Sequence, residues 1–188
     1  MSQNPEKLAE QLPKDAGKSG LPPLDSWHPE LSGDMAMRIS RDGQWIYQGD
    51  PIRRDALVRL FASILRREDD GEYYLVTPVE KWRIQVQDTP LLAHSLTVEG
   101  EGRNQQVSLT TNVGETLVIS EKHPLRVDCY PGSNEPRPVI LVRHGIEARL
   151  TTSAYYDLAQ HLVEQTVDGQ SVYGLYSCGN FYKVGQGG

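Results

Sequence analysis

The chain has 188 residues, of which 38% are hydrophobic and 23% charged, and its net charge is −6. This length suits one large or two small domains with a buried core. No apolar run approaches the roughly 20 residues that a membrane helix needs, and no apolar signal-peptide core is present. We therefore expect a globular cytoplasmic protein without a membrane partner, and the acidic charge argues against binding of long nucleic acids.

The sequence suggests a tail followed by two units. Residues 1–24 are polar with little apolar periodicity, which predicts a mobile tail with a short helix over residues 5–11. We expect a first α+β unit over residues 25–90. A second α+β unit, with a β-meander and a C-terminal helix, is expected over residues 91–184, and residues 185–188 form a second tail.

The clearest pattern lies in residues 39–67. Asp42-Gly43 between two short apolar segments predicts a β-hairpin, because Asp and Gly tolerate positive φ. Asp50-Pro51 is typical of a helix start, so we predict a helix over residues 53–67. Its apolar residues recur at helical spacing and define one face: Leu57, Leu60, Phe61, Ile64 and Leu65.

Residues 141–167 repeat this pattern without a gap at an offset of 102, which aligns Arg41 with Arg143 and Asp55 with Asp157. The second helix is predicted over residues 153–166, with Thr152 and Ser153 as candidate caps. An Asp-Gly pair and a Tyr-rich strand follow each helix. This order predicts a duplicated hairpin–helix–strand unit. Chance similarity is the alternative, because such units are common.

The remaining segments are predicted strands. Gly33-Asp34 opens a strand over residues 35–39, and Asp34 is interpreted as a turn carboxylate rather than a site residue. Five further strands would form an antiparallel meander: residues 81–86, 92–98, 106–111, 116–120 and 126–130. The loop at residues 131–136 is a boundary or a surface excursion. The predicted class is α+β, with strands dominating and each helix lying across a curved antiparallel sheet.

Catalytic and metal-binding motifs are absent from the sequence. There is no GxxxxGK[ST], no GxSxG and no HExxH, and the five histidines show no ligand spacing. Cys129 and Cys178 form no CxxC pair. We therefore predict no cofactor, no bound metal and no disulfide, and we expect a binding protein rather than an enzyme.

A basic, aromatic segment marks the predicted site. Residues 35–68 carry a charge of +3, which leaves −9 for the rest of the chain, so a small anion is favoured over a long polyanion. Guanidinium groups bind phosphate or carboxylate, and aromatic rings stack on planar ligands. A solvated helix face, with Trp45 and Tyr47 in the core, is the alternative. The predicted ligand-binding residues are Arg41, Trp45, Tyr47, Arg53, Arg59, Thr77, Glu80 and Lys81.

Several motifs resemble an uncharacterised proteobacterial family, domain of unknown function 1285. They are Asp42-Gly43-x-Trp45-x-Tyr47, Ile64-Leu65-Arg66-Arg67 and Leu75-Val76-Thr77-Pro78-Val79-Glu80-Lys81, with Ala148-Arg149-Leu150 as a looser anchor. The resemblance covers most of residues 22–184. It implies a duplicated α+β core, a second half loosely like a pleckstrin-homology fold, and a nucleotide-like ligand between the halves with a signalling role. It implies no enzyme activity.

Three functions follow from these observations. A regulatory module that binds a small anionic, nucleotide-like ligand is favoured. The alternatives are an enzyme acting on a phosphorylated or carboxylated small molecule, and a scaffold that binds a protein partner. Turnover of a bound ligand would separate the enzyme from the binding module.

Overall fold

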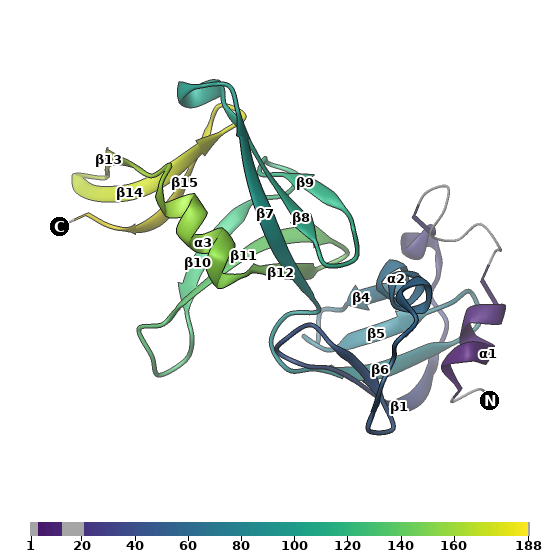
Figure 1. Ribbon diagram of the computed structural model, residues 1–188. Helices are drawn as coiled ribbons and strands as arrows, with labels where there is room; N and C mark the ends of the chain where they lie inside the picture. Colours follow the sequence, from purple (N-terminus) through teal and green to yellow (C-terminus); the bar gives the residue numbers. More distant parts are fainter. Residues whose placement is uncertain (1–3, 13–20, 188) are drawn as a thin grey trace. The chain divides into compact units, whose positions relative to one another are not determined.

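The computed structural model describes residues 4–12 and 21–187 (Figure 1). It contains two compact units: the first extends to Pro90 and includes His144–Ile146, and the second comprises Leu91–Arg143 and the residues from Glu147. Strands dominate and helices are few, in agreement with the predicted strand-rich α+β class. The predictions of tails at residues 1–3, 13–20 and 188 lie outside the described residues.

Sheet A forms the first unit. Its strands lie in the order β3-β2-β1-β6-β5-β4, and the two central strands, β1 and β6, run parallel while the other neighbours are antiparallel. The parallel pair corrects the prediction of purely antiparallel sheets. The strands are β1 (Leu31–Ile39), β2 (Trp45–Tyr47), β3 (Asp50–Pro51), β4 (Leu65–Arg67), β5 (Tyr73–Val76) and β6 (Lys81–Val86).

Sheet B forms most of the second unit and has the same strand order. It reads β9-β8-β7-β12-β11-β10, again with a parallel central pair, β7 and β12. Its first and fourth strands begin 60 residues after those of sheet A, since 91 − 31 and 125 − 65 both give 60. The strands are β7 (Leu91–Glu99), β8 (Gln106–Thr111), β9 (Thr116–Val118), β10 (Leu125–Cys129), β11 (Pro136–Arg143) and β12 (Ile146–Leu150).

The repeat is therefore real, but its unit is a six-stranded sheet and not the predicted hairpin–helix–strand unit. The offset of 102 was wrong, because it aligns the first and second strands of sheet A with the fifth and sixth strands of sheet B. The two helices also occupy different places: α2 (Asp55–Ser63) follows a third strand, and α3 (Thr152–Ala159) follows a sixth. A hairpin followed by a helix can be recognised within a short stretch of sequence. The pairing of the first strand with the sixth joins distant parts of the chain, so a short stretch of sequence does not reveal it.

Both helices are shorter than predicted. The helix expected to reach residue 67 ends at Ser63, because Leu65–Arg67 pairs with β5 as strand β4. Asp50-Pro51 forms β3 instead of a cap, and Arg54 occupies the N-cap of α2 without a side-chain hydrogen bond. For α3 the cap is Thr151, whose side chain accepts a hydrogen bond from the Ala154 N–H, rather than the predicted Thr152 or Ser153.

The segment expected to be a mobile tail is ordered where the structure describes it. Helix α1 (Pro5–Glu10) places Leu8 completely out of contact with solvent, and Leu12 is also buried. The short 3-10 helix η1 (Leu24–Ser26) follows. The polar composition of this segment, rich in Lys, Gln and Gly, therefore did not reveal that the apolar side chains at residues 8 and 12 are buried.

The second unit adds sheet C, with the order β13-β14-β15. Its strands are β13 (Val163–Val167), β14 (Gln170–Ser177) and β15 (Asn180–Gln186), and a second 3-10 helix, η2 (Gly102–Asn104), connects β7 to β8. The predicted loop at residues 131–136 connects β10 to β11 and is exposed. No helix in the described part of the chain combines the length and apolarity that crossing a membrane requires.

The two units have different cores. The core of the first unit contains aromatic side chains: α2 lies against sheet A (Figure 1), and Phe61 of this helix stacks on buried Trp45. Trp82 is also buried in this core, whereas Tyr74 is buried on the opposite face of the sheet. In the described part of the second unit, by contrast, the buried hydrophobic side chains are all aliphatic.

Candidate functional site

One face of sheet A carries a row of polar side chains. Arg66 pairs with Tyr74 across β4 and β5, Tyr74 pairs with Arg83 on β6, and Arg83 pairs with Asp34 on β1. Lys81 lies on the same face of β6 as Arg83, because side chains alternate along a strand. The intervening Trp82 points into the core on the other face. We call this row, with Lys81, the polar face of sheet A.

An ionic chain fixes one end of the polar face. Arg66 Nη2 lies 2.6 Å from Glu68 Oε2, and Lys81 Nζ lies 2.8 Å from Glu68 Oε1. The ammonium of Lys81 also lies 4.7 Å from the centre of the Tyr74 ring, a cation–π contact. Partial burial opposes ionisation of Glu68, but the hydrogen bonds from Lys81 and Arg66 outweigh it, and the pKa of Glu68 lies below its usual value.

Arg66 also has a structural role. Its Nη1 donates to the carbonyl oxygens of Leu24 at 2.9 Å and Trp27 at 3.0 Å. These bonds attach the η1 segment to strand β4. Substitution of Arg66 would therefore disturb folding, so this side chain is unsuitable for a binding test.

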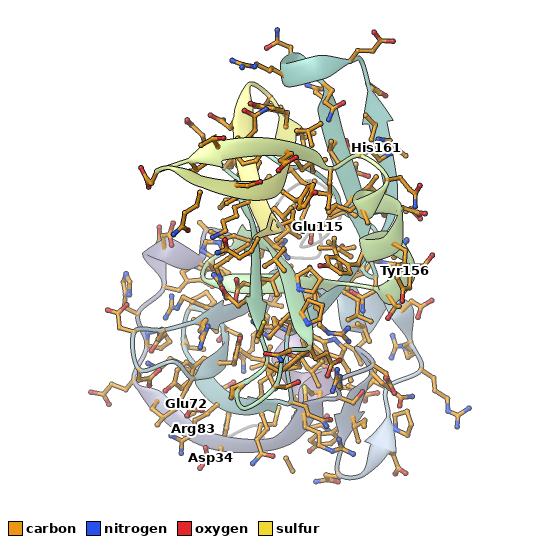
Figure 2. The ribbon with its side chains drawn as sticks, turned by 90° about the vertical axis from the view of Figure 1, so that its left-hand side faces the viewer. Asp34, Glu72, Arg83, Glu115, Tyr156 and His161 are labelled. Carbon is orange, nitrogen blue, oxygen red and sulfur yellow. The ribbon has the colours of Figure 1, made fainter. Side chains whose placement is uncertain are left out.

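Two further pairs order the rest of the polar face. The Tyr74 hydroxyl donates to Asp70, and this bond, with burial, raises the pKa of Tyr74 to about 12. The same bond and one from the Glu72 N–H lower the pKa of Asp70. Arg83 forms a two-pronged pair with Asp34 at 2.5 and 3.0 Å, and the two side chains lie together in Figure 2. Asp34 is therefore an ion-pair partner within β1, not the predicted turn residue.

A groove lies beside the turn between β4 and β5. Its volume is about 470 Å³, and it opens to solvent; we call it the hairpin groove. The guanidinium of Arg67 lies beside the turn. Its Nε donates to the Gly71 carbonyl at 3.2 Å, and the guanidinium carbon lies 5.3 Å from the centre of the Tyr73 ring. The groove combines cationic groups with carboxylates. It is lined by Asp25, His28, Arg66, Arg67, Glu68, Asp69 and Asp70.

Two predicted site residues belong to the other side of the sheet. Trp45 is 1% exposed, and its ring centroid lies 6.2 Å from that of Phe61, so the core alternative is correct for this residue. Tyr47 shares its face of β2 and is half-buried. The alternation of the strand was predicted correctly, but α2 covers the apolar face at Trp45.

The predicted arginines do not gather with Lys81. Arg41 lies in the turn after β1, where its backbone N–H donates to Gln87 Oε1 at 3.1 Å. Arg53 precedes α2 and Arg59 lies on it, and both are exposed. Because α2 covers the core face of sheet A, these two arginines lie on the opposite side from the polar face.

The side chains of Thr77 and Glu80 are engaged in hydrogen bonds within the first unit. Thr77 is completely buried, and its Oγ1 accepts hydrogen bonds from the Val79 and Glu80 N–H groups. Gln11 bonds to both side chains: its Nε2 donates to Glu80 at 2.6 Å, and its Oε1 accepts from Thr77 at 3.1 Å. Of the predicted residues at this edge, Lys81 alone joins the ionic chain described above.

Sequence reasoning missed Glu68, Asp70 and the role of Arg66. The signal was present, because Asp70-Gly71 marks a hairpin turn that places Arg66 opposite Tyr74. This signal was missed because Arg66 was predicted to lie in the helix, so the alternation of side chains along β4 was not recognised.

Elsewhere the structure offers fewer reactive arrangements. Cys129 and Cys178 are free and exposed. His144 lies in the turn before β12 with a φ of 47°, as expected for a turn histidine. Among residues 4–12 and 21–187, no three His, Cys, Asp or Glu side chains gather in a way that would hold a metal ion. A second groove of about 670 Å³ lies between β10 and β15 in the second unit.

Comparisons with known proteins place the chain in a family. Residues 22–89 match the N-terminal domain of the domain of unknown function DUF1285, and residues 90–184 match its C-terminal domain. A crystal structure of a DUF1285 family protein from Silicibacter pomeroyi DSS-3 is 40% identical, with a TM-score of 0.86 over 99% of this chain and 97% of that one.

A DUF1285 family protein from Shewanella baltica OS155 is 27% identical, with a TM-score of 0.52 over 66% of this chain and 91% of that one. Among curated proteins, none matches the chain. The predicted resemblance is confirmed: two family models together cover residues 22–184, and the chain belongs to the DUF1285 family.

Proposed function

We propose that the protein is a regulatory module that binds a small anionic, nucleotide-like ligand in the hairpin groove. One observation carries this proposal: Arg67 and His28 line the groove together with Arg66 and Glu68, and these last two are linked to Lys81 in one ionic chain. The proposed groove lies within the first unit. A pleckstrin-homology-like second half and a signalling role stay predictions that this proposal does not require.

Two residues that line the groove, Arg66 and Glu68, are held in place before a ligand arrives. Arg66 donates hydrogen bonds to two carbonyl oxygens and to Glu68, and Glu68 accepts a hydrogen bond from Lys81. A site whose side chains are already fixed loses less conformational entropy on binding. In this proposal the ionic chain fixes the positions of the groove residues, although not every residue of the chain contacts the ligand.

The lining favours a ligand with mixed chemistry. A phosphate or carboxylate group would meet the guanidinium of Arg67 and the imidazole of His28. Hydroxyl or amino groups, as in a ribose or a base, would donate to the carboxylates of Asp25 and Asp69. A polyanion would be repelled by those carboxylates and by the net charge of −6, so a single small molecule fits best.

The test is thermal unfolding of the full chain with inorganic phosphate, nucleoside monophosphates and cyclic nucleotides as probes. A ligand at 100 times its Kd adds about 2.7 kcal/mol to the free energy of unfolding. Arg67→Ala is expected to weaken binding by about 1–3 kcal/mol, the range for a hydrogen bond to a charged group. The melting temperature of this variant without ligand should hardly change, since Arg67 is exposed.

Arg59→Ala is the matched control, because Arg59 is an exposed arginine of the same unit on α2. It should bind the probe like the parent protein. If Arg59→Ala lost binding and Arg67→Ala kept it, the hairpin groove would be the wrong site. Chromatography of the probe after incubation separates binding from turnover: an altered probe would favour the enzyme alternative.

A further inference from the structure

Strand β13 is an edge strand with both faces open. Within the described residues it pairs with β14 only, at the margin of sheet C (Figure 1). Val163 is 41% and Val167 42% exposed, and Glu164 and Thr166 on the other face are exposed as well. An exposed edge strand presents unpaired backbone N–H and C=O groups that favour addition of another strand. Charges, prolines or a covering helix commonly block such edges, and Glu164 is the sole charged side chain of β13.

We propose that β13 pairs antiparallel with β13 of a second copy of this chain, centred on Gln165, and joins two copies of sheet C. The segment Val163-Glu164-Gln165-Thr166-Val167 has a self-complementary pattern. A two-fold axis through Gln165 places Val163 opposite Val167 of the second copy. It also places Glu164 opposite Thr166, and Gln165 opposite its own equivalent.

The cross-strand neighbours decide the direction of pairing. In the antiparallel register the two Val–Val pairs bury exposed apolar surface, and each Glu164 faces a hydroxyl group. In a parallel, in-register pairing, each Glu164 would face Glu164 of the second copy, and like charges directly opposite are unfavourable. The carboxylate of Glu164 already accepts a hydrogen bond from Ser171 on β14, which holds it on its face of the sheet.

Nearby apolar surface would extend the contact. Tyr173 of β14 lies opposite Glu164 of β13 and is 39% exposed, so its ring is on the same face of sheet C as Glu164. A five-residue strand alone buries less than the roughly 1,200–2,000 Å² of a standard interface. The dimer is therefore expected to dissociate on dilution rather than to be permanent.

The first test measures the mass of the full chain in solution over a range of concentrations. Val163→Lys and Val167→Glu should each weaken dimerisation about tenfold, because each loses both Val–Val pairs of the symmetric contact. An equal mixture of the two variants should recover dimers, since the introduced lysine then faces the introduced glutamate and one Val–Val pair is restored. Val79→Lys is the control, because Val79 is a 70% exposed valine of the first unit.

The second test is disulfide trapping in a chain that carries Cys129→Ser and Cys178→Ser. Gln165→Cys should form a cross-linked dimer on mild oxidation, because the two thiols meet at the two-fold axis. Glu164→Cys should not, since the equivalent residues are offset along the strands beyond the roughly 7 Å limit for Cα atoms in a disulfide.

Three results would overturn the proposal. One is a chain that stays monomeric at every concentration it reaches in solution. Another is a dimer that Val163→Lys and Val167→Glu leave unchanged. The last is cross-linking through Glu164→Cys as readily as through Gln165→Cys, which would indicate parallel pairing.

Discussion

Sheets A and B share one strand order but are filled by different side chains. The core of sheet A contains Trp45, Phe61 and Trp82, whereas the described core of the second unit is built from Leu, Ile, Val and Ala. The order of strands is thus independent of the kind of apolar residue that covers them. What the two sheets share is alternation along each strand and one parallel pair at the centre.

The helices show a second difference. In sheet A, α2 is inserted between the third and fourth strands and contributes Phe61 to the core. In the second unit a short link, residues 119–124, takes that place, and α3 follows the sixth strand and packs near β7. An apolar sheet face must be covered, but the covering element can come from different points of the chain.

Substitution of the aromatic core is the strongest way to separate the two units. Trp45→Ala should reduce the free energy of unfolding of the first unit by about 3–5 kcal/mol, because it removes a fully buried indole and leaves a cavity. Urea unfolding followed by tryptophan fluorescence measures this, since Trp27, Trp45 and Trp82 all lie in the first unit.

Leu109→Ala is the counterpart in the second unit, where Leu109 is completely buried. It should cost about 2–5 kcal/mol and be detected by far-UV circular dichroism. A loss below about 1 kcal/mol for Trp45→Ala would contradict its place in the core and return it to the list of site residues.

Removal of the Glu68 charge tests the ionic chain of the polar face. Glu68→Gln should cost about 1–3 kcal/mol at pH 7, because Arg66 and Lys81 both lose their anionic partner in a partly buried site. The pKa of Glu68 is lowered in the folded protein, so its contribution is complete above the unfolded value of about 4.3 and is lost as the pH falls through the folded pKa. Parent and variant should therefore converge in acid.

Asp128→Asn supplies the contrast in the second unit. Asp128 pairs with Arg126, but its side chain is 50% exposed, so the substitution should cost less than about 1 kcal/mol. Denaturant unfolding at several pH values compares the two variants. A constant difference between the parent protein and Glu68→Gln from pH 7 down to acid would show that the charge of Glu68 is not the stabilising feature.

The helix caps provide the smallest contrast. Thr151→Ala should cost about 1 kcal/mol, because the Thr151 side chain accepts the Ala154 N–H at the start of α3. Arg54 makes no such bond at the start of α2, and Arg54→Ser should stabilise the first unit by several tenths of a kcal/mol. Thermal unfolding measures both; a loss of stability for Arg54→Ser would assign a separate role to the Arg54 side chain, whose Nη1 lies 3.8 Å from Glu6.

Local features of the fold were predictable from sequence. The hairpin at Asp42-Gly43, the shared face of Trp45 and Tyr47 and the existence of both main helices follow from turn residues and apolar spacing, and the structure contains all of them. The family and the strand-rich α+β class were predicted as well. These properties depend on residues that are neighbours in the chain.

Tertiary structure decided the repeat and the grouping of polar side chains on sheet A. The parallel pairing of β1 with β6 joins residues some fifty positions apart, and no local pattern announces it. Trp45 and Arg53 looked like members of one surface, but α2 covers the Trp45 face and leaves Arg53 on the far side of the sheet. Arg66 and Lys81 meet through Glu68 because two hairpin strands and their turn fold together. Alternation along a strand says which side chains share a face, but which face becomes core depends on what packs against it, and that contact is formed only by the folded chain.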